Sequence, residues 1–497
     1  MNVTKLKRGL IKAGKVFQKI LPPPLLAMLI CAILASYINF MPPINGLADN
    51  GDYYRAMYSN GIYKLLGTHY SYFDFVTQKF GLMKYYNDYQ SVNFSSQPLF
   101  VKLAIGLNKL FYSQTVFDIR FMGLVNTGFY LGSIYLLTDA LTYPAKRPRN
   151  YLIAGLVVFV FGDSSFTLYF NSFFAEPQML SMTLYSFAAV LLLARHRYRR
   201  RWPLLLLFGV STMLLISSKS QNAPLALSYV VVALGLLFLP NFKAQRLIIF
   251  AGMAGLLVVG VLTYKLIGSS FTQINQYQAF SHGVLTQTGD PSTDLRKSGI
   301  DEQYALMKDQ DYYAKQFAPI DASGKYVKKN LLTKYNFSWI ATYYAKHLPQ
   351  FGKLLDLTAA DAMITQVKAV GDYTKASGAP AGKQVTFFTG FSSIAGAFFP
   401  QKYAFNCLLA VALAMVYAVG FYNDLKAHAS EGVLRFFLVL GYLTIFIFVP
   451  IISIVGDGDA DLAKHIFMVP VSIDLIFLLV VSDILNHRLW HAYHEGT

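Results

Sequence analysis

Long uninterrupted apolar runs constrain this chain more than any other feature. Runs of roughly 17 to 25 residues recur along it, and each is long enough to cross a hydrocarbon layer about 30 Å thick as a helix. They account for a chain of 497 residues that is 55% hydrophobic and only 14% charged. We therefore predict an all-α polytopic membrane protein with about ten transmembrane helices. The predicted spans are 24–41, 117–138, 150–167, 176–194, 203–217, 222–239, 247–267, 403–422, 433–454 and 465–484.

Basic residues cluster in every second connection between these spans. Such clustering marks cytoplasmic loops, so the net charge of +17 indicates topology and not nucleic-acid binding. We expect both termini to be cytoplasmic and the protein to be integral to the plasma membrane, which in a bacterium is the inner membrane. The basic flanks are Lys5–Lys19, Lys146–Arg149, Arg195–Arg201, Lys243–Arg246, Lys426–Arg435 and Arg488.

The same topology predicts the domain organisation. Residues 1–270 would form an N-terminal transmembrane catalytic module, in which 42–116 is the first outer loop, and 403–497 would form the C-terminal helices. Leucines at helical spacing from Leu99 to Leu110 predict an interfacial helix in the first loop. Residues 271–402 are too many for an unstructured connector, so we expect a mainly helical outer cap.

Two acidic sites lie where the predicted spans meet the non-cytoplasmic side. Asp49 and Asp52 follow the first span, and Glu176 begins the fourth. A carboxylate within hydrogen-bond reach of a hydroxyl can act as its general base, so either aspartate is a candidate base, with Asp49 preferred, and Glu176 is a candidate to orient it. The plainer interpretation is ordinary loop polarity.

Cationic and amide side chains occur on the same predicted face. Fixed cations can hold a phosphate leaving group on which negative charge develops, although a lone lysine at a membrane boundary is often only an anchor. The candidates for phosphate binding are Lys219, Lys464, His465 and Arg55. The candidates for positioning the substrate are Gln97, Gln221 and Asn222.

This arrangement resembles the GT-C superfamily of membrane glycosyltransferases, which use lipid-phosphate-linked sugars. Ala48-Asp49-Asn50, followed by two tyrosines, is similar to the acidic motif of the family's first outer loop, whose carboxylate is implied to be the catalytic base. Asn50 departs from the usual second acid, which leaves the choice between Asp49 and Asp52 open. Glu176 matches an acidic residue that the resemblance implies positions the acceptor or a metal.

Two shorter motifs extend the resemblance. Gln97-Pro98-Leu99-Phe100 is similar to the opening of the family's interfacial helix, and the segment from Asp461 to Pro470 is similar to a basic motif near the last helices. The resemblance implies a polyprenyl-phosphate-sugar donor and a glycan or glycopolymer acceptor on the outer face. We predict no cofactor with certainty and leave the need for a divalent metal open.

Three other functions compete with this interpretation. A transporter or flippase of a lipid-linked glycan would favour acidic residues midway along helices and internal repeats, of which the sequence has few. A polymerase or ligase of lipid-linked oligosaccharides would favour arginines in the large outer loop, where Arg296 is the only one. A non-catalytic scaffold of the cell envelope is the third alternative.

Overall fold

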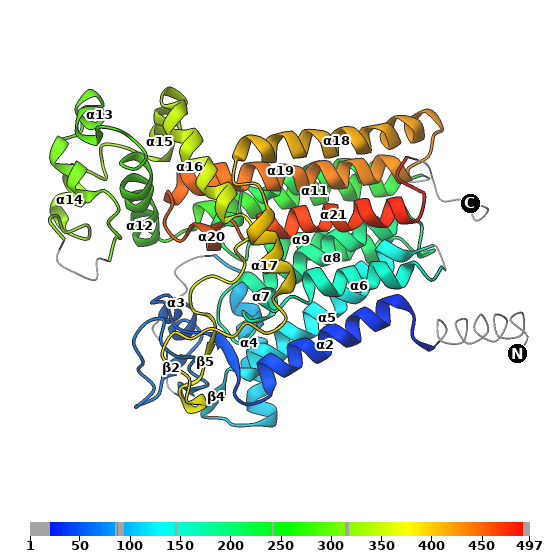
Figure 1. Ribbon diagram of the computed structural model, residues 1–497, viewed down its shortest axis with the longest axis horizontal. Helices are drawn as coiled ribbons and strands as arrows, with labels where there is room; N and C mark the ends of the chain where they lie inside the picture. Colours follow the sequence, from blue (N-terminus) through cyan, green and yellow to red (C-terminus); the bar gives the residue numbers. More distant parts are fainter. Residues whose placement is uncertain are drawn as a thin grey trace, which may run out of the picture.

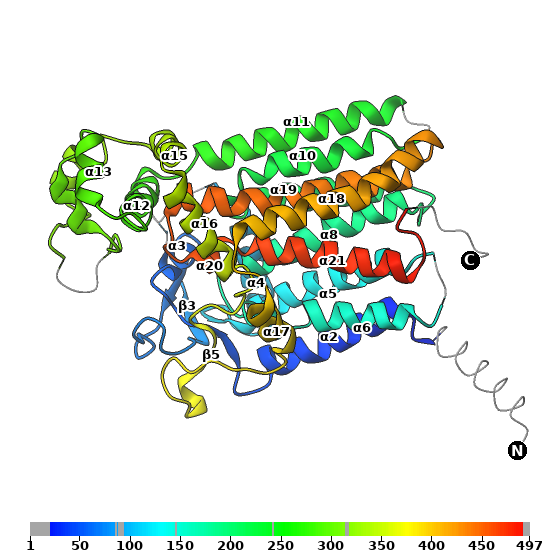
Figure 2. The same ribbon diagram turned by 45° about the horizontal axis from the view of Figure 1, so that its top comes forward.

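Ten apolar helices lie side by side in the computed structural model, which describes residues 20–84, 87, 94–144, 147–240, 243–313 and 318–490 (Figures 1 and 2). Within these ranges, seven helices are long and apolar enough to cross a membrane: α2 (Pro23–Phe40), α5 (Arg120–Thr142), α8 (Glu176–Ala194), α11 (Lys243–Lys265), α18 (Tyr403–Lys426), α19 (Glu431–Asp457) and α21 (Met468–Leu485). Three apolar helices are shorter: α6 (Asn150–Phe161), α9 (Trp202–Ile216) and α10 (Leu225–Leu236). The chain is a mainly helical, polytopic integral membrane protein.

One predicted span ends earlier than the apolar run that suggested it. The run 150–167 is helical only as far as Phe161, and a separate turn, α7 (Ser164–Thr167), follows. The reason is Asp163, whose side chain accepts a hydrogen bond from the backbone of Ser165 and so caps a new helix. Each of the other nine predicted spans coincides with a helix to within a few residues.

Helix α8 lies at the centre of the bundle. It is apolar on all sides and almost wholly buried, as expected of a helix surrounded by others, and it packs against α5, α9 and α19. Helices α2, α11 and α18 instead keep exposed apolar side chains, among them Ile33, Leu247 and Leu408. These exposed faces are the surfaces that lipid would cover.

The two ends of the bundle differ in structure. The end where α2 begins and α21 ends has short connections, and we call it the short-loop end. There, a buried aspartate on α21, Asp483, accepts hydrogen bonds from Arg195, Arg435 and Arg488, at N···O distances of 2.9, 2.9 and 2.8 Å. All four side chains are at most 1% exposed, so this network ties three helix ends together without reaching solvent.

The other end, which we call the loop-rich end, carries short strands that the all-α prediction did not include. Strands β2 (Ile62–Lys64), β3 (Lys79–Leu82) and β4 (Val116–Asp118) form an antiparallel sheet in that order. Helices α3 (Tyr53–Tyr58) and α4 (Gln97–Phe111) accompany this sheet. Along α4, Leu99, Leu103 and Leu110 are exposed on one face, in agreement with the amphipathic helix predicted there.

The segment between α11 and α18 has two parts. Its first part is a helical lobe that projects beyond the bundle at the left of Figure 1. The lobe and its connection to the bundle comprise α12 (Ser269–Ala279), η2 (Phe280–Val284), α13 (Pro291–Lys297), η3 (Glu302–Met307), α14 (Lys325–Asn330), α15 (Phe337–Lys346) and α16 (Leu348–Asp361).

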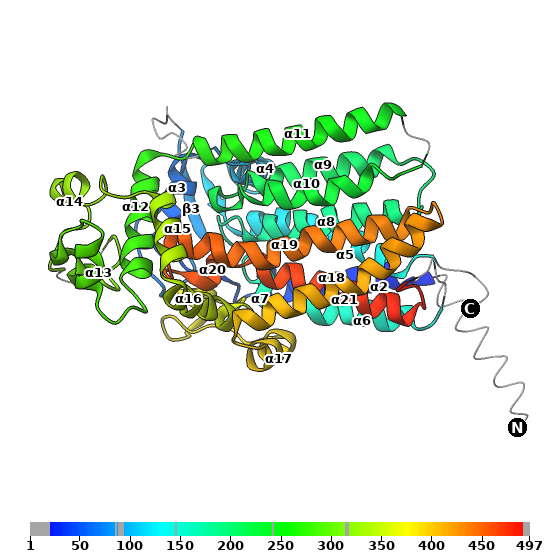
Figure 3. The same cartoon turned by 90° about the horizontal axis from the view of Figure 1, so that it is seen from above.

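The second part returns to the bundle. Strand β5 (Val370–Tyr373) pairs antiparallel with β1 (Asn45–Leu47), directly after α2. This pairing brings Gly46 so close to Asn171 that an added Cβ would lie 2.7 Å from its carbonyl oxygen, so a glycine is needed there. After η4 (Lys375–Ser377), helix α17 (Gly390–Phe398) lies beside the bundle (Figure 3).

Candidate functional site

Seven charged or titratable side chains meet at the loop-rich end, and we call them the charged cluster. They come from four places: the start of α3, the start of α8, the turn between α9 and α10, and the end of α19 with its connection to α21. That connection contains the short helix α20 (Leu462–His465). The charged cluster consists of Asp52, Arg55, Glu176, Lys219, Asp457, Lys464 and His465.

Asp52 is the carboxylate of this cluster that two cations share. Its Oδ1 lies 2.6 Å from Nη2 of Arg55, and its Oδ2 lies 3.4 Å from Nζ of Lys464. Burial raises the pKa of the Asp52 carboxyl, but Lys464 and Arg55 outweigh that effect and hold the pKa below its ordinary value. The side chain remains 30% exposed, so Asp52 is an ionised carboxylate that a ligand can reach.

Glu176 and Lys219 form the second pair. Glu176 starts α8 and its side chain is fully buried, with Oε1 3.3 Å from Nζ of Lys219 and Oε2 without a hydrogen-bond partner. Burial lowers the pKa of the Lys219 ammonium, and the attraction of Glu176 restores it only in part. Since Lys219 is 24% exposed, it presents a cation at the surface of the site while Glu176 supports it from beneath.

Lys464 and His465 are neighbours in α20 but have different surroundings. Nζ of Lys464 lies 4.1 Å from the centre of the Phe174 ring, a cation–π contact, besides its contact with Asp52. Nδ1 of His465 lies 3.3 Å from Oδ2 of Asp457. Burial, with Lys219 and Lys464 nearby, lowers the pKa of His465 well below 6.5. The imidazole is therefore neutral near pH 7, and any contact it makes with a phosphate would be a hydrogen bond without charge.

Asp49 lies outside the charged cluster. Its Oδ2 forms an ion pair with Nζ of Lys64 at 2.6 Å, and its Oδ1 accepts hydrogen bonds from the backbone N–H groups of Gly51 and Tyr53. These bonds hold the turn that carries Asp52 towards Lys464. In this geometry Asp49 shapes the turn, whereas Asp52 faces the other charged groups.

The three predicted positioning amides all donate to protein carbonyl groups. Gln221 donates to His465 O at 3.0 Å and so joins the turn before α10 to α20. Gln97 donates to Phe173 O, next to the ring that contacts Lys464. Asn222 donates to Leu215 O and Ser218 Oγ and closes the turn between α9 and α10. Gln97 and Gln221 therefore support residues beside the cluster, and Asn222 holds its own turn.

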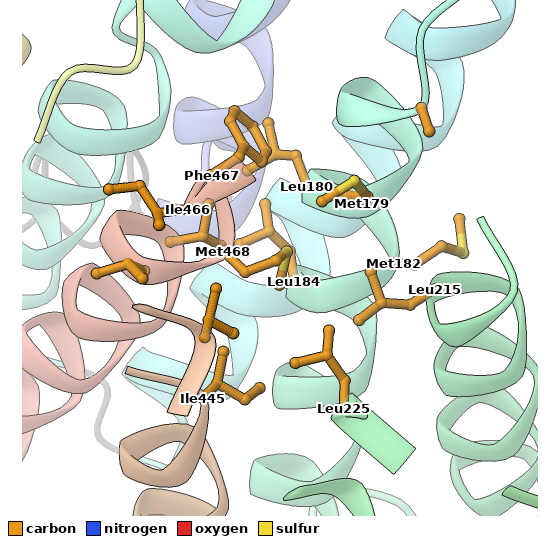
Figure 4. Close-up of a cluster of buried hydrophobic side chains, with 14 of the residues drawn as sticks. Met179, Leu180, Met182, Leu184, Leu215, Leu225, Ile445, Ile466, Phe467 and Met468 are labelled. Atoms are coloured by element: carbon orange, nitrogen blue, oxygen red, sulfur yellow. The ribbon is translucent and has the colours of Figure 1, made fainter. Parts of the chain in front are cut away.

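An apolar layer lies directly beneath the cluster. Figure 4 shows Met179 and Leu180, just after Glu176, close to Phe467 and Met468, which follow His465. All four side chains are buried. Because charge is costly within such a layer, the polar groups meet only at its edge, where they can pair with one another.

Two features of the site were not anticipated from the sequence. Asp457, the partner of His465, is the last residue of α19. Its position in the predicted outer connection that also contains Lys464 could have indicated that it belongs to the site. Lys64, the partner of Asp49, had no such signal. Across the described ranges, no group of three or more His, Cys, Asp or Glu side chains is arranged to hold a metal ion.

Comparisons with known proteins give a family and one distant structural likeness. The archaeal oligosaccharyltransferase AglB from Archaeoglobus fulgidus, solved with an inhibitory peptide and a dolichol-phosphate, is similar over 95% of this chain at 14% identity, with a TM-score of 0.37. This chain spans about half of that protein, 51% of its length. None of the curated proteins matches the chain. The family described as "YfdI N-terminal transmembrane domain" matches residues 9–496, and the chain belongs to this family.

Proposed function

We propose that this protein is a GT-C-like glycosyltransferase that moves a sugar from a polyprenyl-phosphate donor to a hydroxyl group of a cell-envelope glycan or glycopolymer. The observation that carries the proposal is the Asp52 carboxylate, partly exposed and shared by Arg55 and Lys464 where an apolar bundle ends. A lipid-linked sugar phosphate needs an apolar surface for its lipid, cations for its phosphate and a base for its acceptor. The charged cluster and the bundle supply these three together.

In the proposed reaction, Asp52 takes the proton of the acceptor hydroxyl as its oxygen attacks the anomeric carbon. The bond from that carbon to the phosphate oxygen breaks, and its electron pair leaves with the polyprenyl phosphate. Protonation removes the charge of Asp52 at the moment when negative charge grows on the phosphate. Arg55 and Lys464, which had paired with Asp52, are then released to bind the phosphate.

Lys219 is proposed as the third cation that contacts the phosphate. Its ammonium group is held by Glu176, whose fully buried carboxylate is better suited to fixing a neighbour than to meeting a substrate. A cation fixed in advance costs little reorganisation when charge develops. Glu176 therefore acts in this scheme through Lys219, as a positioning residue.

We place the site on the non-cytoplasmic side of the membrane. Support comes from the arginines between Arg195 and Arg201, which follow α8 at the short-loop end, whereas the charged cluster lies at the loop-rich end. Basic connections are retained in the cytoplasm, so the opposite end would face outwards. A donor carried by a polyprenyl lipid would have its sugar on that outer face.

The experiment is transfer of radiolabelled sugar from synthetic polyprenyl-phosphate donors to the glycans of an envelope extract by the purified, full-length protein. Asp52→Asn keeps the shape of the side chain and removes the base, so transfer should fall by about 10² to 10⁴-fold. Asp49→Asn keeps the Oδ1 acceptor that holds the turn and should cost much less. Glu302→Gln, in an exposed ion pair of the lobe, is the matched control and should retain full transfer.

The outcomes separate the alternatives. Loss of transfer in Asp49→Asn but not in Asp52→Asn would overturn the assignment of the base while supporting a glycosyltransferase. A folded protein that consumes no donor, but moves a fluorescent lipid-linked glycan across a vesicle membrane, would overturn the glycosyltransferase and favour the flippase. Elution as a single species by gel filtration establishes folding for every variant.

A further inference from the structure

The returning part of the segment between α11 and α18 contains a stretch unlike the lobe before it. From Gln384 to Gln401 there is no charged residue, and five phenylalanines fall within these positions. Helix α17 lies inside this stretch and has no buried residue. Phe398 is 82% exposed and Ile394 is 53% exposed. Such a contiguous apolar surface is costly in water and commonly marks a contact with lipid or protein.

Two aromatic contacts place this stretch at the depth of the transmembrane helices. Phe387 packs on Tyr37, one turn before α2 ends, with ring centres 4.7 Å apart. Phe391 packs edge-on against Phe159 near the end of α6, with ring centres 5.7 Å apart. The stretch therefore lies alongside the helix ends and not above them, and Figure 3 shows α17 projecting from the side of the bundle.

The surface that surrounds α17 is itself apolar and exposed. Ile33 and Tyr37 on α2, and Leu152 and Phe159 on α6, are exposed along the same two helices that the stretch contacts. Helix α2 is long and apolar enough to cross a membrane, and the shorter apolar helix α6 packs against it. The exposed face of α17 is thus continuous with the surface that the bundle presents to lipid.

Three carbonyl groups in the irregular part of the stretch accept hydrogen bonds from the protein. Irregular backbone at membrane depth is tolerated only where the protein itself bonds its polar groups. Ser164 donates to the carbonyl oxygens of Phe387 and Phe388 through Oγ and N–H, and Gln366 donates to that of Val385.

Asp163 fixes the start of α17. This fully buried carboxylate accepts hydrogen bonds from the backbone N–H of Ser392 at 2.8 Å and from its hydroxyl at 3.0 Å. A carboxylate in this place also complements the dipole at the helix N-terminus. Asp163 therefore ends α6 and clamps α17 against it, which leaves Ile394 and Phe398 facing away from the protein.

We propose that residues 387–399 insert into the bilayer and form a lipid-contacting anchor for the segment between α11 and α18. The occupant of this surface is the acyl-chain region of membrane lipid. Lys383 and Lys402 bracket the stretch. Lys402 pairs with Asp356 at 2.7 Å but stays 75% exposed, so its ammonium can also meet a lipid phosphate at the interface. This part of the segment is then a membrane-embedded element that packs on α6.

Site-directed spin labelling in phospholipid nanodiscs tests the proposal without reference to activity. In a background with Cys31→Ala and Cys407→Ala, single labels are placed at Phe398→Cys and Ile394→Cys. Leu408→Cys, on the exposed face of α18, is the control for lipid, and Ala381→Cys, in the polar loop before the stretch, is the control for water. Power saturation measures the accessibility of each label to oxygen and to a water-soluble nickel complex.

We expect the labels at 394 and 398 to be more accessible to oxygen than to the nickel complex, like the lipid control at 408. The label at 381 should be more accessible to the nickel complex than to oxygen. Nickel accessibility at 398 equal to that at 381 would overturn the proposal, because α17 would then lie in water. Low accessibility to both reagents would also overturn it, because a protein surface would then cover α17. The two test positions are independent, so failure of one variant to fold leaves the other informative.

Discussion

The buried network at the short-loop end supports a quantitative prediction about stability. Asp483 accepts one hydrogen bond from each of three arginines at 2.8 to 2.9 Å. In Asp483→Asn the side chain keeps its shape but loses its charge, and its amide N–H group faces guanidinium groups that can only donate. Three buried cations would then lack their shared counter-ion.

The cost follows from burial. Removing one partner of a buried ion pair costs about 3 to 5 kcal/mol, and Asp483 serves three partners that are at most 1% exposed. The ion pair between Arg296 and Glu302 has the same kind of groups but is 70% and 54% exposed. Glu302→Gln should therefore cost about 0 to 1 kcal/mol, and the difference between the variants reports the burial of Asp483 together with its larger number of partners.

Thermal unfolding of the detergent-solubilised protein, followed by tryptophan fluorescence, measures this difference. Asp483→Asn should have a clearly lower Tm than Glu302→Gln, and adding Arg435→Met should restore part of the loss, because it removes one of the unpaired charges. Equal Tm values for Asp483→Asn and Glu302→Gln would refute the reasoning, since burial would then make no difference.

Three further predictions concern the loop-rich end. As the pH falls, transfer activity should be lost only below pH 3.8, the ordinary pKa of an aspartate, because the pKa of Asp52 is lowered. As the pH rises, activity should begin to fall before pH 10.5, because the pKa of Lys219 is also lowered and its ammonium loses its proton. A pH profile of kcat/KM with an acid limb near pH 6 would contradict the first expectation. Gly458→Ala should lower the Tm by destabilising the contact with the lobe, because φ is +67° and the new Cβ would lie 2.5 Å from the backbone of His282; an unchanged Tm would contradict it. Burial lowers the pKa of His282, but two aspartates raise it to about 9, so its stabilisation is full below pH 6.5 and lost as the pH rises through 9. Tm measured from pH 6.5 to 9.5 should fall more in the wild type than in His282→Gln, and parallel curves would exclude this role.

The architecture of the bundle could be predicted because span length and apolarity are local properties. A run of apolar residues must satisfy its backbone internally in lipid, whatever its neighbours are. The exception at Asp163 has a local cause, its cap on Ser165, and a tertiary one, its hydrogen bond from Ser392. The family match and the apolar helices agree with this part of the prediction.

The chemistry of the candidate site was only partly accessible in the same way. The residue types on one face could be chosen from the alternation of basic and non-basic loops. The pairing of these residues could not be predicted, because Asp52 and Lys464 are separated by 412 positions in the chain. The same holds for the pKa of His465, which burial and the two nearby lysines lower.

By itself, then, the sequence determined a helical membrane protein with carboxylates and cations in the connections at one end. Only the tertiary structure decided that Asp52 meets Lys464 while Asp49 meets Lys64, and that α17 lies against the bundle instead of in the lobe. The physical reason is that hydrophobicity is summed along a local segment, whereas an ion pair or a pKa depends on distances of a few ångströms between segments that folding brings together.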